Sequence, residues 1–189
     1  MISELDKIAI DILEKIYKED NKTNLWENSK YEKQRKIQID KRGSVGERFF
    51  AEVLFKLYPR RIEYNDGDQG DWDLKISGIK FEIKTSSIDV NKKFQNEGLK
   101  IDGDYEGILF LGITPNQLYI KFMKKNDIDF SKLHNRGNDN NGKKATGAGY
   151  KYDLKEKDML KVKSLKDIEN EFEKQFSSLL KTKSKKGKV

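Results

Sequence analysis

Residues 72–84, WDLKISGIKFEIK, alternate apolar and charged side chains on either side of Ser77-Gly78. Strict alternation is typical of β-strands, and a Ser-Gly pair between two such runs predicts a hairpin with a two-residue turn. In the simplest register Asp73 lies opposite Glu82, and Asp71 lies opposite Lys84. The chain must therefore fold so that one face of this hairpin is covered by a core, while the opposite face is charged.

Because side chains alternate across a strand, both faces can be assigned from the sequence. The apolar face holds Trp72, Leu74, Ile76, Ile79, Phe81 and Ile83. The opposite face holds Asp71, Asp73, Lys75, Lys80, Glu82 and Lys84. Two neighbouring carboxylates repel each other unless a cation or protons intervene, and Mg²⁺ is commonly bound by one or two carboxylates with water and phosphate oxygens. Asp73 and Glu82 are candidate Mg²⁺ ligands; the alternative is a solvated face with weak ion pairs.

The rest of the chain surrounds this hairpin with helical patterns and short β-like runs. Helical periodicity predicts a first helix over residues 3–19, a second that ends at Ile37, and a third over 44–58 before Pro59. A last helix is predicted to begin at 165, where Ser164 and Asp167 form a capping box. Apolar runs predict strands near 61–64, 72–76, 79–84, 107–113 and 117–123. Helices followed by clustered strands and a final helix predict a mixed α/β (α+β) domain with a central mixed sheet flanked by helices.

We expect one domain over residues 1–180. Its expected parts are a helical region (1–42), a core (43–125), a loop region (126–155) and a C-terminal helix (164–180), followed by a basic disordered tail (181–189).

Composition narrows the class of protein. The 39 Lys and Arg outweigh the 32 Asp and Glu, and the formal charge of +7 fits a polyanionic partner such as nucleic acid. The sequence has no Cys, which excludes disulfides and Cys-based metal sites, and its single His argues against histidine–metal nucleases. No signal-peptide or membrane-span pattern is seen, so we expect a cytoplasmic protein without a membrane partner.

The charged hairpin resembles the catalytic motif of the PD-(D/E)XK nuclease superfamily, and within it the chain looks most like a type II restriction endonuclease. The resemblance rests on the segments RGSVGERFFAEVL, WDLKISGIKFEIKTSS and FQNEGLKIDGDYEGILFLGITPNQLYI, which together span roughly residues 43–125. The family's Pro before the first Asp is absent, and Asp71 competes with Asp73 for that place. Asp73 directly precedes the apolar run and is the preferred residue.

The resemblance implies a Mg²⁺-dependent hydrolase that cuts double-stranded DNA at a specific sequence. In that family's pattern Asp73 and Glu82 would bind Mg²⁺ with the Ile83 carbonyl as a third ligand, and Lys84 would position and activate the attacking water. Glu47 would join the metal site through water or a second metal ion. The alternative is that Glu47 is an ordinary acid near a helix N-terminus. A homodimer and a cognate DNA methyltransferase in the same restriction system are further implications.

Two regions are candidate DNA contacts. The first is Lys80 together with Thr85, Ser86 and Ser87, small hydroxyl residues that follow the catalytic strand and suit phosphate contact. The second is the Gly- and Asn-rich segment 134–152, whose polar side chains are able to reach base edges or phosphates. Its candidate residues are Asn135, Arg136, Asn138, Lys143 and Lys144. The alternative for this segment is a flexible surface loop.

Other functions fit the same sequence. A Holliday-junction resolvase or a repair nuclease of the same fold would use the same motif. A non-catalytic DNA-binding module would keep the fold without the chemistry, and a structural or interaction protein would have a charged face that is only solvated. One subunit of a heteromeric nuclease is a further alternative.

Overall fold

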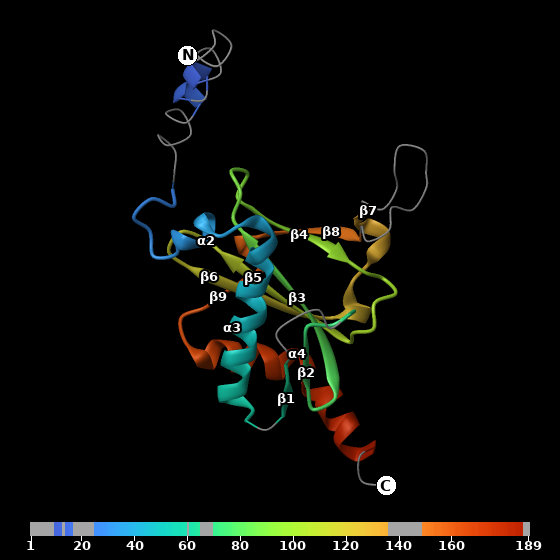
Figure 1. Cartoon of the computed structure of the whole chain (residues 1–189). Helices are drawn as coiled ribbons and strands as arrows, with labels where there is room; N and C mark the ends of the chain where they lie inside the picture. The colour runs from blue at the N-terminus through green and yellow to red at the C-terminus, as the bar shows by residue number, and fades with distance from the viewer. Residues whose placement is uncertain are drawn as a thin grey trace.

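The computed structural model describes residues 10–12, 14–16, 25–59, 61–64, 70–135 and 149–186, without the side chains of residue 40 and residues 182–186. Figure 1 shows two helices packed on a central sheet, with a second sheet on the other side. The predicted mixed α/β class with a central mixed sheet is confirmed, and helices cover one face of that sheet. No described helix is long and apolar enough to cross a membrane.

The helices are α2 (Lys33–Lys36), α3 (Arg42–Leu57) and α4 (Leu165–Lys186). The strands are β1 (Ile62–Glu63), β2 (Leu74–Ile76), β3 (Ile79–Ser87), β4 (Lys93–Leu99), β5 (Gly107–Ile113), β6 (Leu118–Lys124), β7 (His134–Asn135), β8 (Tyr150–Lys155) and β9 (Leu160–Lys161). Short 3₁₀ turns are η1 (Ile39–Lys41), η2 (Lys125–Asp127), η3 (Phe130–Lys132) and η4 (Glu156–Asp158). Residues 10–12 and 14–16 are also helical.

The central sheet has six strands in the order β1-β2-β3-β5-β6-β9. β3 and β5 run parallel, and the other neighbouring strands are antiparallel. Every residue of β5 is buried, as expected for an apolar strand covered on both faces. β3 is therefore an interior strand beside the best-covered strand of the fold.

One face of the central sheet is covered by α3 and α4. Their Phe50, Leu54, Phe172 and Phe176 side chains are fully buried against Phe81 and its neighbours in one apolar cluster. At the N-terminal half of α3, Gly46 allows the helix to approach β3 closely, since a Cβ at this position would lie 1.9 Å from Thr85 Oγ1. This contact fixes α3 against the strand that carries the candidate catalytic residues.

The opposite face is covered by a second sheet, with the order β4-β8-β7, that the sequence analysis did not predict. Phe94 and Leu99 of β4 and Leu154 of β8 pack there against Ile108 and Phe110 of β5. β4 contains a bulge at Gly98, whose φ is +74°, and a run of polar residues interrupts its alternation. The periodicity of β4 is therefore weak, whereas β8 alternates apolar and charged residues, a signal that was not used.

The predicted helices differ from the structure at their ends. The second predicted helix is the short α2, and the segment 3–19 is described and helical only at 10–12 and 14–16. The capping residues at α4 are confirmed, because Asp167 accepts the Ser164 amide at 2.8 Å. The disordered tail predicted from 181 is wrong for residues 181–186, which continue α4; residues 187–189 lie outside the described residues.

The hairpin register is confirmed, with Leu74 opposite Phe81 across a Ser77-Gly78 turn. The predicted face of Trp72 is wrong, because this ring packs with the second-sheet cluster, where the Nζ of Lys75 lies 5.6 Å from its centroid. The Asp73 amide donates to the Phe81 carbonyl at 2.9 Å, and Leu74 is also paired with Phe81. Two residues facing one make a β-bulge, which shifts the alternation by one residue before Leu74.

Both turn residues have positive φ, +51° at Ser77 and +79° at Gly78. A turn of this type favours Asn or Gly at its first central position, because most side chains are strained there. We predict that Ser77→Asn raises the free energy of unfolding by about 0.5 kcal/mol and that Gly78→Ala lowers it by about 1 kcal/mol. Urea denaturation measures both changes; a destabilising Ser77→Asn would contradict this turn geometry.

Candidate active site

Glu82 and Lys84 lie two residues apart on β3 and point from the face that the second sheet covers. Lys84 Nζ is 2.5 Å from Glu82 Oε1, and the exposed fractions of the two side chains are 20% and 13%. These side chains are much less exposed than a surface ion pair. The expectation of a merely solvated charged face is therefore not met at these two residues.

The end of β4 lies over the lysine. Gly98 is 3.7 Å from Lys84 Nζ, measured from the position that a Cβ would take, and its positive φ forms part of the β4 bulge. A Cβ at this position would be in ordinary van der Waals contact with the ammonium group, so the positive φ and not a lack of space favours glycine here. The bulge therefore brings the end of β4 into contact with Lys84.

Asp73 is held at the same edge of β3 by a backbone contact. Its Oδ2 accepts the Ile83 amide at 2.6 Å, just before β2 begins. In an antiparallel ladder the amide and carbonyl of one residue point to the same neighbouring strand. The Ile83 carbonyl therefore points to the side on which the Asp73 carboxylate lies.

Electrostatics also connect these groups. Burial raises the pKa of Glu82; the nearby Asp73 charge adds to the rise, and Lys84 opposes it. The net direction is upward, so burial and the second carboxylate outweigh the ion pair. Perturbed carboxylates of this kind cluster at functional sites, where a cation often compensates the repulsion.

The oxygen donors at this edge fit a magnesium ion. Asp73 and Glu82 supply two carboxylates, and the Ile83 carbonyl is a third hard oxygen on the same side, which is the kind of donor set that Mg²⁺ uses together with water and phosphate. Within the described ranges, no three His, Asp or Glu side chains form a group able to hold a metal. Any ion here would therefore take its remaining ligands from water or phosphate.

Glu47, the fourth predicted catalytic residue, lies in the helix layer. It belongs to α3, in the helix layer, and its Oε1 lies 3.6 Å from the position of a Cβ on Gly43, one turn earlier in the same helix. Glu82 and Lys84 point from the other face of the sheet. The predicted role of Glu47 through water or a second metal stays a prediction.

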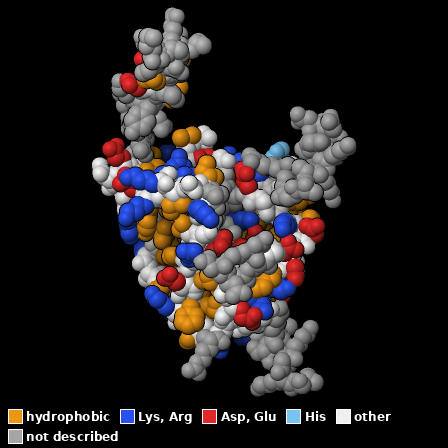
Figure 2. Space-filling model, viewed as in Figure 1, with side chains coloured by type: hydrophobic (Ala, Val, Ile, Leu, Met, Phe, Trp, Pro, Cys, Tyr) orange, Lys and Arg blue, Asp and Glu red, His pale blue; other side chains and the backbone are white. Residues whose placement is uncertain are grey.

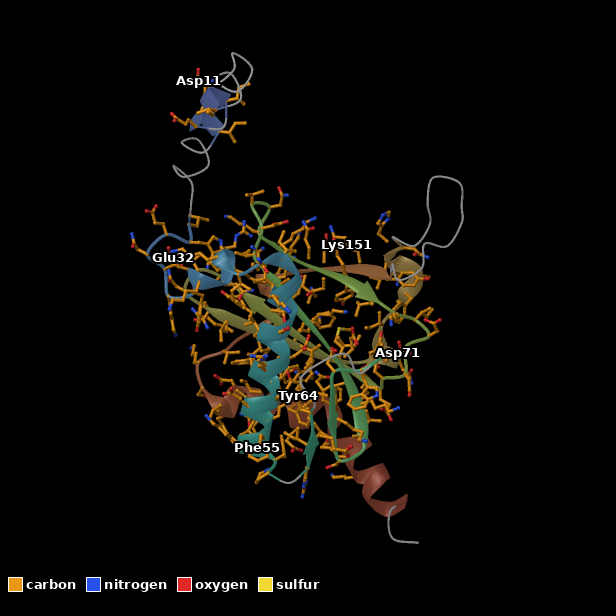
Figure 3. All side chains as sticks on the ribbon, viewed as in Figure 1. Asp11, Glu32, Phe55, Tyr64, Asp71 and Lys151 are labelled. Atoms are coloured by element: carbon orange, nitrogen blue, oxygen red, sulfur yellow. The ribbon has the colours of Figure 1, made fainter. Side chains whose placement is uncertain are left out.

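Asp71 has a different partner from the one the simple register predicts. Its Oδ1 lies 2.7 Å from Lys100 Nζ, and not opposite Lys84, because the bulge at Asp73 ends the regular pairing. The hydrogen bond from Lys100 lowers the pKa of Asp71. In Figure 3 the labelled Asp71 lies at the right-hand edge of the molecule. The backbone contact made by Asp73 supports the preference for Asp73 as the first ligand.

Thr85 and Ser86, two of the predicted phosphate contacts on β3, form hydrogen bonds within the fold. Ser86 is buried and donates to Asn96 Oδ1 at 3.0 Å, and Thr85 donates to the Gly43 carbonyl at 3.3 Å. The Ser87 hydroxyl is buried, with no hydrogen-bond partner in the described part of the chain. The Ser86 hydroxyl joins β3 to β4, and phosphate contact by Thr85, Ser86 and Ser87 stays a prediction.

The remaining predicted DNA contacts have mixed outcomes. Lys80 forms an ion pair with Asp104, and Asn135 is an exposed residue of β7. The other four candidates, Arg136, Asn138, Lys143 and Lys144, lie outside the described residues. Their predicted contacts with DNA stay predictions.

Two residues near the site were missed by the sequence analysis. Lys100 follows β4, and the Tyr105 hydroxyl donates to its backbone carbonyl at 2.6 Å. Tyr105 is buried, and its pKa is raised by burial and by the charge of Glu82. Neither residue was assigned a role, because only the packing of the second sheet brings them to the hairpin.

No protein-family model matches this chain, and a search of curated proteins finds no match either.

The raised pKa of Glu82 predicts a particular pH dependence of stability. Between its usual pKa of 4.5 and the higher folded value, the folded state binds more protons, so ionisation of Glu82 reduces stability as pH rises. We predict that Glu82→Gln is stabilising relative to wild type at pH 7 and that this difference shrinks toward pH 4. Urea denaturation across this pH range measures it.

Asp167 provides a control of opposite sign. Backbone amides of Lys163 and Ser164 lower its pKa, so its contribution is present at neutral pH and is lost as pH falls through the folded pKa. Asp167→Asn should therefore destabilise the protein most at pH 7. If Glu82→Gln showed the same sign as Asp167→Asn, the inferred environment of Glu82 would be wrong.

Proposed function

We propose that this chain is a Mg²⁺-dependent endonuclease of the type II restriction kind, which hydrolyses phosphodiester bonds in double-stranded DNA at a specific sequence. The observation that carries the proposal is the half-buried group of Asp73, Glu82 and Lys84. Asp73 directly precedes β2 and is fixed by a backbone amide, while Glu82 and Lys84 lie in the middle of β3 and touch each other. This is the grouping that the resemblance to PD-(D/E)XK nucleases implies.

The burial of this group favours chemistry over a structural role. Taking charges out of water costs free energy that a single ion pair rarely recovers, and apolar residues would serve the core as well. Glu82 and Lys84 lie on an interior strand whose other side chains are mostly apolar or small. A chain that needed only stability would gain from replacing them.

Each residue has a distinct part in the proposed reaction. Asp73, held by the Ile83 amide, and Glu82 would bind the ion, which when bound supplies charge neutralisation at the phosphate and a water of lowered pKa. Lys84 would hold that water by a hydrogen bond and balance negative charge on the phosphate. Since Lys84 and Glu82 project from the same strand face, the lysine needs no loop movement to reach a water beside the carboxylate.

The charge of the chain is consistent with DNA as the substrate. The formal charge is +7, and Figure 2 shows Lys and Arg interspersed with Asp and Glu on the viewed face. Basic residues attract duplex DNA without regard to its sequence. We further propose that the enzyme acts as a homodimer, since two-fold symmetric proteins suit symmetric target sites, in a cytoplasmic restriction system with a cognate methyltransferase.

The proposal predicts that purified protein cuts unmethylated duplex DNA into discrete fragments when Mg²⁺ is present. Lys84→Ala, Glu82→Gln and Asp73→Asn should each reduce the cleavage rate by about 10²- to 10⁴-fold, because each removes a group that acts on the reacting water or its ion. Gel analysis of phage-type DNA measures the rates, and sequencing of the ends gives the target. Branched DNA serves as a second substrate.

A matched control is available on the same sheet. Lys75 and Glu63 form another pair with an Nζ–Oε2 distance of 2.5 Å, on β2 and β1. Lys75→Ala and Glu63→Gln should leave cleavage unchanged. Equal losses in the two pairs would contradict a specific role for Lys84, and cutting of branched DNA alone would favour a junction resolvase or repair nuclease.

Metal binding has a readout that does not require activity. Mg²⁺ that binds the folded state raises its unfolding temperature by mass action. Wild type should show this shift, and Asp73→Asn combined with Glu82→Gln should abolish it. A shift of the same size in the double variant would show that the ion binds elsewhere.

A further inference from the structure

Lys100 lies beside the candidate site, close to Glu82. It directly follows β4, whose bulge at Gly98 lies against the Lys84 ammonium. The Tyr105 hydroxyl, from a nearly buried ring, binds the Lys100 carbonyl at 2.6 Å. Lys125 lies over that ring, with its Nζ 4.6 Å from the centroid. The backbone of Lys100 is thus fixed, while its side chain is 47% exposed.

The partner of Lys100 is an equally accessible carboxylate. Asp71 Oδ1 lies 2.7 Å from Lys100 Nζ, and the Asp71 side chain is 42% exposed. Exposed pairs of this kind contribute little to stability, so a stronger anion is able to replace the carboxylate. Lys100 also lies close enough to Glu82 for each charge to favour the ionised form of the other.

We propose that Lys100 binds a backbone phosphate of the DNA beside the site and that Asp71 forms an ion pair with the Lys100 ammonium group when no DNA is bound. The inference rests on the proposed function, since it assumes that duplex DNA reaches the edge of β3. A lysine ammonium suits this exchange, because it binds phosphate as a compact charge without requiring a fixed geometry. Asp71 then acts as a competitor of the phosphate and not as a metal ligand.

The two members of the pair are expected to affect DNA binding in opposite directions. Lys100→Ala removes one phosphate contact and should lower the steepness of the salt dependence, the slope of log K against log salt, by about 0.9. Asp71→Asn removes the competitor and should tighten binding about two- to fivefold. Lys100→Arg keeps the charge and should retain the slope. A pair that only stabilises the fold would make Lys100→Ala and Asp71→Asn change binding in the same direction.

The experiment is fluorescence anisotropy with a labelled mixed-sequence duplex, in EDTA to prevent cleavage, from about 50 mM to 200 mM salt. Lys166 and Glu169 on α4 provide the matched control, because their Nζ–Oε2 distance is also 2.7 Å and they lie on the helix layer. Lys166→Ala and Glu169→Gln should change neither slope nor affinity. Thermal unfolding of every variant verifies that it is folded.

Three results would overturn the inference. Weaker binding by Asp71→Asn would show that the pair acts as a structural unit, and equal slopes for Lys100→Ala and Lys166→Ala would show only a general effect of charge. In both cases wild type still binds duplex DNA, so the proposed function survives. If wild type binds no duplex at any of these salt concentrations, the inference and the proposed function both fail.

Discussion

The rest of the structure depends on β3, which lies between two layers, with helices on one face and the second sheet on the other. Its parallel pairing with β5 places Phe81 and Ile83 under the helices and places Glu82 and Lys84 under the second sheet. A strand covered on both faces is normally apolar throughout, as β5 is. Charges on such a strand reduce stability unless they are paired, and here the pairing is between neighbours on the strand itself. The fold therefore sets two charged groups in a partly dry layer with a fixed separation.

Polar bonds around this pair hold the second sheet in place over it. Ser86 donates to Asn96 on β4, and the Asn96 amide donates to the Tyr152 carbonyl on β8 at 3.1 Å. All three elements are thus joined through one buried asparagine, which is 2% exposed. Because unsatisfied polar groups are costly in such a layer, this network specifies where β4 crosses β3. The position of Gly98 over Lys84 follows from that crossing.

Sequence periodicity predicted the elements whose partners are close along the chain. The alternation in β2 and β3 gave the hairpin register, and the wholly apolar β5 indicated an interior strand. It missed β4, because polar residues and Gly98 hide its period. It also missed β8, whose residues YKYDLK do alternate, because this short run follows the Gly- and Asn-rich segment and pairs with a distant strand. It also misplaced Trp72, since a one-residue bulge leaves no mark in an alternating pattern. Asp73, Glu82 and Lys84 were accessible from the motif, whereas Lys100 and Tyr105 depend on how the second sheet packs.

The bulge that changes the face of Trp72 also explains why Asp71 and Asp73 lie in different environments. It ends the ladder at Asp73, so the Ile83 amide turns to the Asp73 carboxylate and fixes it through the backbone. Asp71, two residues earlier, has left the strand and meets the exposed Lys100. A carboxylate fixed by a backbone amide is better preorganised to bind an ion than one in an exposed ion pair, because it keeps its position without ordering a long side chain. The choice between the two acids therefore follows from where the ladder ends.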